Sequence, residues 1–263
     1  MSTALEPRAH RPRIIPVLLL MGGLLHKTVR FTKPRYVGDP RIAVKIFNDK
    51  CADEIVLLDA RATVEARAPD YRLIEEIAGE CFMPLAYGGG VRDVESAKTL
   101  FGLGVEKVIV NSAAVANPRL VGALADRFGA QSIVAAIDVK RDWLGRPRVV
   151  THSGTRRPGH EPVAWARQVQ VLGAGEILLN SVDRDGTFAG YDIPLIRAVA
   201  DSVGVPVVAC GGAGSVDDCV RAVREGGASA AAAGSIFVFQ GVHRAVLINF
   251  PADAVLASKF DDR

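Results

Sequence analysis

Acidic side chains stand at or just after the ends of apolar runs, where they could move protons. Asp59 and Asp138 each close a run of aliphatic residues, and Asp183 and Asp185 follow a third such run after a short gap. Partial burial at the end of a strand can tune a carboxylate for acid or base catalysis. Each could instead cap the next helix or form an ion pair. Lys27, a short loop beyond the first apolar run, could contact a phosphate or close over a ligand.

Glycine and small polar residues follow four other apolar runs. Glycine lets backbone N–H groups approach an anion closely, and serine adds a hydroxyl donor. The pattern therefore predicts two phosphate sites, one in each half of the chain, although tight turns between strand and helix would also use glycine. The candidate phosphate-binding residues are Gly89, Gly90, Asn111 and Ser112 in the first half, and Gly211, Gly212, Gly234 and Ser235 in the second.

Charged residues of alternating sign begin four of the apolar runs: Arg13, Glu54, Lys107 and Glu176. In parallel strands these positions share one end of the sheet, opposite to the candidate acids, where they could pair as a ring. Such a ring is either a stabilising network or a gate to the interior. Residue pattern alone favours the network.

Short runs rich in Val, Ile and Leu alternate with stretches of helical periodicity, a pattern typical of a parallel sheet with crossover helices. Eight strands and their helices predict an α/β fold, a (β/α)₈ barrel. The predicted strands are 13–20, 54–60, 82–87, 107–111, 132–138, 176–181, 206–210 and 230–237. The predicted helices are 40–49, 70–80, 94–103, 117–128, 162–172, 193–203 and 216–225.

The two halves of the chain echo each other. The first Gly-rich turn at Gly88 matches Gly211, and Ser112 matches Ser235, both at a spacing of 123 residues. A third pair, 57–59 with 178–180, is shifted by 121 residues. A near-constant shift predicts duplicated half-barrels, while chance similarity of glycine turns is the alternative.

Length and composition favour one domain. The chain has 263 residues, of which 49% are hydrophobic, enough for one barrel over residues 13–263 after a flexible tail over residues 1–12. A net charge of +3 with scattered basic residues gives no case for nucleic acid. The apolar run 14–20 follows two arginines as in a signal peptide, but it lacks a cleavage site and suits a first strand better. No run spans a membrane, four unclustered cysteines favour reduced thiols, and we expect a cytoplasmic protein without metal or cofactor.

The motifs of the chain resemble the cyclase subunit of imidazole glycerol phosphate synthase. They are IIPVLLL, LLDA, YGGGVR, VNSAAVANP, RFGAQSIVAAIDVKR, LGAGEILLNSVDRDGT, GYD and CGGAGS, and they cover about residues 13–239. The resemblance implies a barrel that takes ammonia from a glutaminase subunit docked on its N-terminal face. Ammonia would then react with a bisphosphate ribulosyl aminoimidazole, in a lyase reaction of histidine biosynthesis. It also implies that Arg13, Glu54, Lys107 and Glu176 form the family's ammonia gate, and that Asp138 and Lys27 are catalytic.

One position departs from the family pattern. Leu19 stands where the family carries its second catalytic aspartate, and leucine cannot exchange a proton. Loss of one member of an acid/base pair costs about 10² to 10⁴ in rate, unless Asp59 or another group substitutes. Asn180 is a milder departure, since the family has Thr or Ser there.

An intact gate with altered chemistry resembles a paralogous branch associated with amidation of bacterial surface sugars, and the stretch 29–40 looks more like that branch too. There the barrel and its glutaminase supply ammonia to a separate amidotransferase. We expect this function first and an active cyclase second. A barrel that only scaffolds and activates its glutaminase is a third, non-enzymatic possibility.

Overall fold

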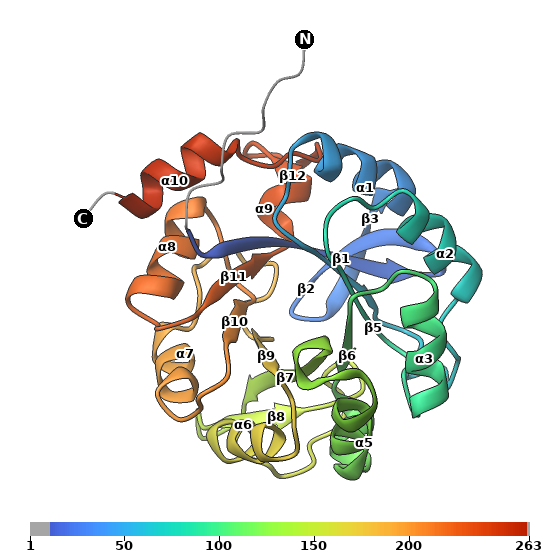
Figure 1. Cartoon of the computed structure of the whole chain (residues 1–263). Coiled ribbons are helices and arrows are strands. Elements are labelled where there is room, and N and C mark those ends of the chain that lie inside the picture. The colour runs from blue at the N-terminus through green and yellow to red at the C-terminus, as the bar shows by residue number, and fades with distance from the viewer. Residues whose placement is uncertain (1–10, 262–263) are drawn as a thin grey trace.

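The computed structural model describes residues 11–261, which form a closed eight-stranded parallel barrel surrounded by helices (Figure 1). Each barrel strand pairs in parallel with the next, and β11 pairs with β1 to close the ring. The predicted (β/α)₈ fold is thus confirmed. In ring order the strands are β1 (Arg13–Met21), β4 (Ile55–Asp59), β5 (Leu85–Gly88), β6 (Lys107–Val110), β7 (Ile133–Arg141), β9 (Glu176–Ser181), β10 (Val207–Cys210) and β11 (Ala230–Ala233).

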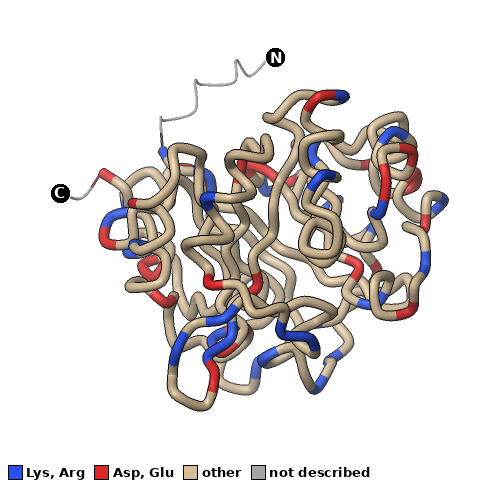
Figure 2. Tube along the Cα trace, turned by 90° about the horizontal axis from the view of Figure 1, so that it is seen from below, with Lys and Arg blue, Asp and Glu red and all other residues tan. Residues whose placement is uncertain are grey.

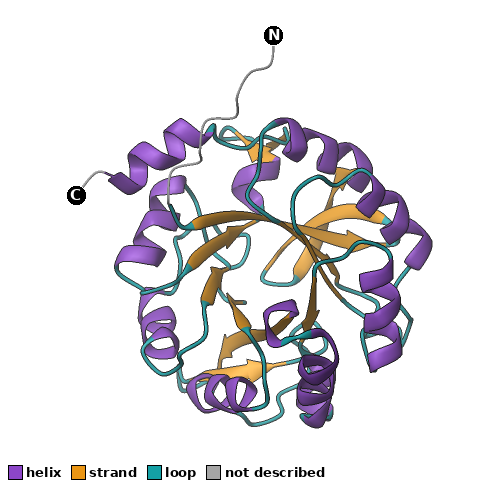
Figure 3. Ribbon diagram, viewed as in Figure 1, coloured by secondary structure: helices purple, strands orange, loops and turns teal. Residues whose placement is uncertain are grey.

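Helices cover the outside of the barrel (Figure 3). The long ones are α1 (Pro40–Asp49), α2 (Tyr71–Gly79), α3 (Val94–Gly102), α5 (Arg119–Phe128), α6 (Pro162–Val171), α7 (Ile193–Ala200), α8 (Val216–Arg224) and α10 (Asp253–Asp261); the short ones are α4 (Ser112–Ala116), α9 (Ser235–Val238) and the 3₁₀ turn η1 (Ala130–Ser132). Side-chain caps fix several starts: Asp39, Asp70, Asp93, Asp192 and Ser215 each accept a backbone N–H of the first turn, which satisfies a donor that has no partner within the helix.

Alternation along the strands makes two apolar layers. On β1, Ile14, Leu18 and Leu20 pack outward with the helices, whereas Ile15 and Val17 face the barrel interior. The inner layer is completed by aliphatic side chains from the other strands, including Ala230 and Ala232 of β11, so that the barrel interior is lined by apolar groups. This is the period-two pattern of a strand buried on both faces.

The half-barrels repeat each other in detail. α3 and α8 both begin with a capping box, and their N-cap residues Asp93 and Ser215 have almost the same backbone angles (φ −153°, ψ 172° and φ −155°, ψ 171°). Each half also opens with a nine-residue strand that folds back into antiparallel strands. β1 continues into β2 (Leu24–Val29) and β3 (Thr32–Gly38), and β7 into β8 (Pro147–Val150). Neither hairpin was predicted from the sequence.

The predicted eighth strand, 230–237, is wrong in its second half. β11 ends at Ala233, and residues 235–238 form α9, which places Phe237 and Val238 in the outer core. The apolar run is therefore shared by a strand and a helical turn, which its composition alone does not separate. β12 (Phe239–Gln240) and β13 (Ala245–Val246) follow as a small antiparallel pair.

The beginning and end of the described chain are tied together. Arg11 donates hydrogen bonds to Asp53 ahead of β4 and to Asp253 at the start of α10, and its side chain is only 5% exposed. The fold thus includes Arg11, two residues before the predicted boundary; residues 1–10 of the predicted tail lie outside the described part. Within residues 11–261, no helix is long and apolar enough to cross a membrane.

Candidate functional site

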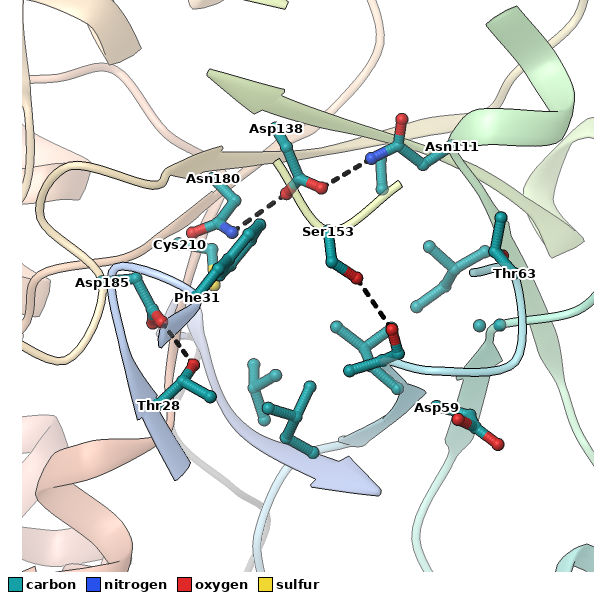
Figure 4. Close-up of a pocket in the computed structure, with 18 of the residues that line it drawn as sticks. Thr28, Phe31, Asp59, Thr63, Asn111, Asp138, Ser153, Asn180, Asp185 and Cys210 are labelled. Carbon is teal, nitrogen blue, oxygen red and sulfur yellow. Dashed lines mark hydrogen bonds between the residues drawn. The ribbon is translucent and has the colours of Figure 1, made fainter. Parts of the chain in front are cut away.

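A cavity of about 490 Å³ opens at the carboxyl ends of the barrel strands. Its floor is apolar, from side chains such as Val17, Leu58, Ile109 and Leu178, and its rim carries the polar residues that the sequence singled out (Figure 4). In (β/α)₈ barrels this face holds the active site. The structure therefore brings Asp138, Asp185 and Lys27 to one cavity. The two glycine loops, 88–90 after β5 and 211–212 after β10, line the same cavity.

Asp138 lies at the centre of a hydrogen-bonded row. Asn111 donates to Asp138 Oδ2 at 2.6 Å and Asn180 donates to Oδ1 at 3.0 Å (Figure 4). Burial raises the pKa of Asp138 to about 6, against the two amide donors, which lower it; the nearby Asp185 adds to the rise. A carboxyl group with that pKa is suited to exchange protons near neutral pH. Asn111 Oδ1 and Asn180 Oδ1 are buried acceptors without a hydrogen-bond partner among the described residues.

Leu19 faces the same cavity from the opposite side of the barrel. β1 and β7 are separated by three strands in either direction around the ring, so Leu19 and Asp138 lie on opposite walls of the cavity. Leu19 is in register with Leu58 of β4, and both line the cavity. The wall facing Asp138 is therefore aliphatic where a second acid would stand.

Asp59, the other candidate acid on this wall, lies at the edge of the cavity. Leu58 takes the inward position on β4, and the Asp59 carboxylate points away from the centre of the cavity (Figure 4). It accepts the backbone N–H groups of Arg61 and Ala62 and pairs with Arg67 at 3.2 Å. These donors engage the carboxylate and fix the turn after β4, and a proton-transfer role for Asp59 stays a prediction.

Lys27 and Asp185 meet near Gly234, which follows β11. Lys27 comes from β2, a strand rather than the predicted loop, and its Nζ lies 3.6 Å from Asp185 Oδ1. Thr28 Oγ1 donates to Asp185 Oδ2 at 3.5 Å. A Cβ on Gly234 would lie 2.6 Å from Lys27 Nζ, so this buried cation sits directly against the loop that was predicted to bind phosphate.

Both glycine loops have the same backbone shape. Gly89 and Gly212, 123 positions apart, each have φ of +119°, which only glycine adopts without strain. A Cβ would lie 2.5 Å from the Asp59 carbonyl oxygen at Gly89 and 2.3 Å from the Gly190 carbonyl oxygen at Gly212. Tight packing alone thus requires these glycines, and anion binding remains a prediction.

The other loop residues are partly engaged by the protein. Asn111 holds Asp138, and Ser112 Oγ accepts the N–H of His152 at 3.0 Å. Gly90, with φ +74°, packs against the Arg67 carbonyl oxygen, while Gly211 contacts Ser181. Ser235 is buried at the start of α9. All of these loop residues line the cavity.

The four charged residues at the opposite barrel end form a closed ring. Arg13 donates to Glu54 and Glu176, and Lys107 Nζ lies 3.0 Å from Glu54 and 2.9 Å from Glu176. Although burial opposes the charged form, the carboxylates of Glu176 and Glu54 raise the pKa of Arg13. The predicted pairing is present, directly below the apolar interior.

The segment 151–161, called the strap below, starts at the mouth of the cavity and was not predicted from the sequence. His152 and Ser153 have φ of +52° and +54°, an uncommon conformation for such residues. Ser153 Oγ donates to the Ala60 carbonyl oxygen at 2.7 Å (Figure 4).

Phe31 of the β2–β3 turn and Cys210 also line the cavity. Burial raises the pKa of the Cys210 thiol to about 12, which keeps it protonated. Only the tertiary arrangement places these residues at the mouth.

The fold and cavity define a (β/α)₈ barrel with a partly buried carboxyl group between two matching glycine loops. Comparison with known proteins narrows this class: residues 13–243 match the family model described as "Histidine biosynthesis protein". A Pseudomonas aeruginosa protein named "Putative imidazole glycerol phosphate synthase subunit hisF2" is 49% identical, over 92% of this chain and 96% of its own.

Two further relatives carry similar names. A Leptospira borgpetersenii "Putative imidazole glycerol phosphate synthase subunit HisF" is 49% identical, over 92% of this chain and 95% of its own. A Vibrio vulnificus "Putative imidazole glycerol phosphate synthase subunit hisF3" is 48% identical, over 93% and 95%. The chain belongs to the family of imidazole glycerol phosphate synthase cyclase-type subunits.

Proposed function

We propose that this barrel receives ammonia from a glutaminase subunit on its N-terminal face and conducts it to the C-terminal mouth, for amidation of a nucleotide-activated or surface-polysaccharide sugar by a separate amidotransferase. The observation that carries the proposal is Leu19. With an aliphatic wall opposite Asp138, a cyclase reaction that needs an acid on each side of its substrate loses one of them.

The charged ring and the barrel interior support conduction. Ring opening at Arg13 or Lys107 would admit a small neutral molecule to an interior lined by Ile15, Val56, Ala86 and similar side chains. Apolar walls disfavour a charged ion, so ammonia would cross as the neutral molecule rather than as ammonium. At the upper end the amide oxygens of Asn111 and Asn180, which lack a partner within the described residues, offer acceptors for N–H donors.

An active cyclase is the second candidate. The two matched glycine loops and the buried Lys27 favour it, because they suit a ligand with a phosphate at each end. We rank it second because phosphate binding alone does not catalyse.

The deciding experiment bypasses every partner. Purified protein is mixed with the bisphosphate ribulosyl aminoimidazole and a high concentration of ammonium at alkaline pH, and loss of substrate absorbance is followed. We expect substrate binding without turnover. Turnover near an ordinary enzyme rate of roughly 1 to 10 s⁻¹ would establish a cyclase and overturn the ranking.

A further inference from the structure

The hairpin that continues β7 past the mouth exposes large apolar side chains at its tip. Trp143 is 87% exposed and Leu144 is 51% exposed. An exposed tryptophan with arginines nearby is the composition that dominates binding energy at protein interfaces. Trp143 follows Asp138 by only five residues of nearly continuous strand, which places it about 17 Å from Asp138 along the chain.

The tip is held rigid by Asp142. This carboxylate accepts the backbone N–H groups of Leu144 and Arg146, both at 2.9 Å, and pairs with the Arg146 side chain at 3.1 Å. These hydrogen bonds and that ion pair lower the pKa of Asp142 although desolvation opposes them. At the base, Arg141 pairs with Asp192 at 2.8 Å. A preorganised loop loses little conformational entropy when it docks.

The same segment holds the surplus positive charge of the chain. Residues 140–161 contain six Lys and Arg against two Asp and Glu, whereas the whole chain has a net charge of only +3. Arg156 and Arg157 are exposed and, within the described residues, make no ion pair. In Figure 2, one group of Lys and Arg positions lies along the lower edge of the molecule, and others are spread over the rest of the chain. Charge of one sign at a mouth attracts a partner of the opposite sign.

From these observations we infer that the β7–β8 hairpin and the strap 151–161 form a docking surface for a protein with an acidic face and an apolar pocket that takes Trp143. This inference rests on the proposed function: the partner is the sugar amidotransferase, seated over the mouth so that ammonia leaves the cavity into it. A folded protein is the assigned partner because the proposed function needs a second active site over the mouth, which neither a nucleic acid nor a membrane supplies.

The test measures binding of the purified amidotransferase to the barrel–glutaminase complex by interferometry at low and high salt. Trp143→Ala should weaken binding by about tenfold or more, and the double variant Arg156→Glu/Arg157→Glu should weaken it and flatten its salt dependence. Ile42→Ala is the control for the loss of an exposed apolar side chain, since Ile42 is 60% exposed on α1, which covers the outside of the barrel away from both faces that are proposed to dock a partner. Arg119→Glu/Arg127→Glu on α5 carries the same charge change at two exposed arginines away from the mouth.

The outcomes distinguish failure of the docking surface from failure of the proposed function. If wild-type protein supports glutamine-dependent amidation, and neither the Trp143 variant nor the Arg156/Arg157 variant changes binding, the docking surface is wrong and ammonia delivery stands. If wild-type protein neither binds the amidotransferase nor supports amidation, both fail. A duplex DNA fragment and phosphatidylglycerol vesicles serve as competing probes: binding to either that depends on Trp143 or on Arg156 and Arg157, with no amidotransferase binding, overturns the protein-partner assignment.

Discussion

Leu19 and Leu58 stand side by side on β1 and β4, in register, and both face the cavity. Only position 19 is expected to complete an acid/base pair with Asp138. In the ammonium assay, Leu19→Asp should therefore raise cyclase turnover by at least about 10²-fold. Leu58→Asp introduces the same charge one strand away and should give no gain. An inert Leu19→Asp protein that still binds substrate would refute the explanation of the defect.

Asp138 should make stability depend on pH in a particular direction. Its pKa is raised to about 6 by burial, above the value of about 3.9 for an unfolded aspartate. The folded state therefore binds the proton more tightly, so this group's stabilising contribution is complete below about pH 4 and is lost as pH rises through 6.

Substitution of Asp138 by Asn should remove this dependence. The free energy of unfolding of wild type relative to Asp138→Asn should fall by about 2 to 3 kcal/mol between pH 4 and pH 7. Denaturant titrations at several pH values give this difference directly. A difference that stays constant or rises with pH would mean that the carboxyl group is not titrating as a buried acid.

At the scale of elements, the second glycine loop is fixed by backbone contacts. Gly212 has φ of +119° and a Cβ there would lie 2.3 Å from the Gly190 carbonyl oxygen. Gly212→Ala should destabilise the protein by about 2 to 4 kcal/mol, because it adds a clash to backbone strain. At Gly102, the last residue of α3, a Cβ would meet nothing within 4 Å, and Gly102→Ala should be neutral or stabilise by up to about 1 kcal/mol. Thermal unfolding should show a clear loss for the first variant and none for the second.

Elements were predictable where pattern and period agreed. α1 has the bounds that its periodicity predicted, because Asp39 caps it and Pro40 suits the first turn. The hairpins β2–β3 and β7–β8 were missed because their strands extend beyond the barrel and lack a buried, period-two face of their own, as the exposed β3 shows.

The sequence predicted which residues belong to the candidate site better than it predicted how they are arranged. The strand pattern predicted that Asp138, Lys27 and both glycine loops share one rim, because the carboxyl ends of parallel strands lie together. It could not show which way Asp59 points, since one position of register decides between cavity and helix layer. Nor could it place the strap through His152 and Ser153, whose hydrogen bonds join loops distant in sequence.

At the scale of the whole molecule, Arg11 fastens the first described residues to the last helix. Its nearly buried guanidinium bridges Asp53 and Asp253, and Arg11→Ala leaves both carboxylates without it. We expect a loss of about 1 to 3 kcal/mol. Arg72→Ala, which removes an exposed pair with Glu76, should cost at most about 0.5 kcal/mol. If the two variants lose the same free energy of unfolding in denaturant titrations, the Arg11 bridge contributes no more than an exposed ion pair.

The ring of charges joins four strands, and its function can be tested only in the complete assembly. Lys107→Met leaves Glu54 and Glu176 with Arg13 alone and removes one of the two cations at which we propose that the ring opens. In a reaction with glutaminase, amidotransferase and sugar, we expect normal glutamine hydrolysis but less amidated product per glutamine consumed. Lys107→Arg keeps the charge and should recover part of the transfer, Lys98→Met on the exposed face of α3 should change nothing, and added ammonium should restore product by bypassing the barrel. An unchanged ratio of product to glutamine would rule out a gate at Lys107, and a loss of hydrolysis with the ratio intact would identify the barrel as an activating scaffold instead of a conduit.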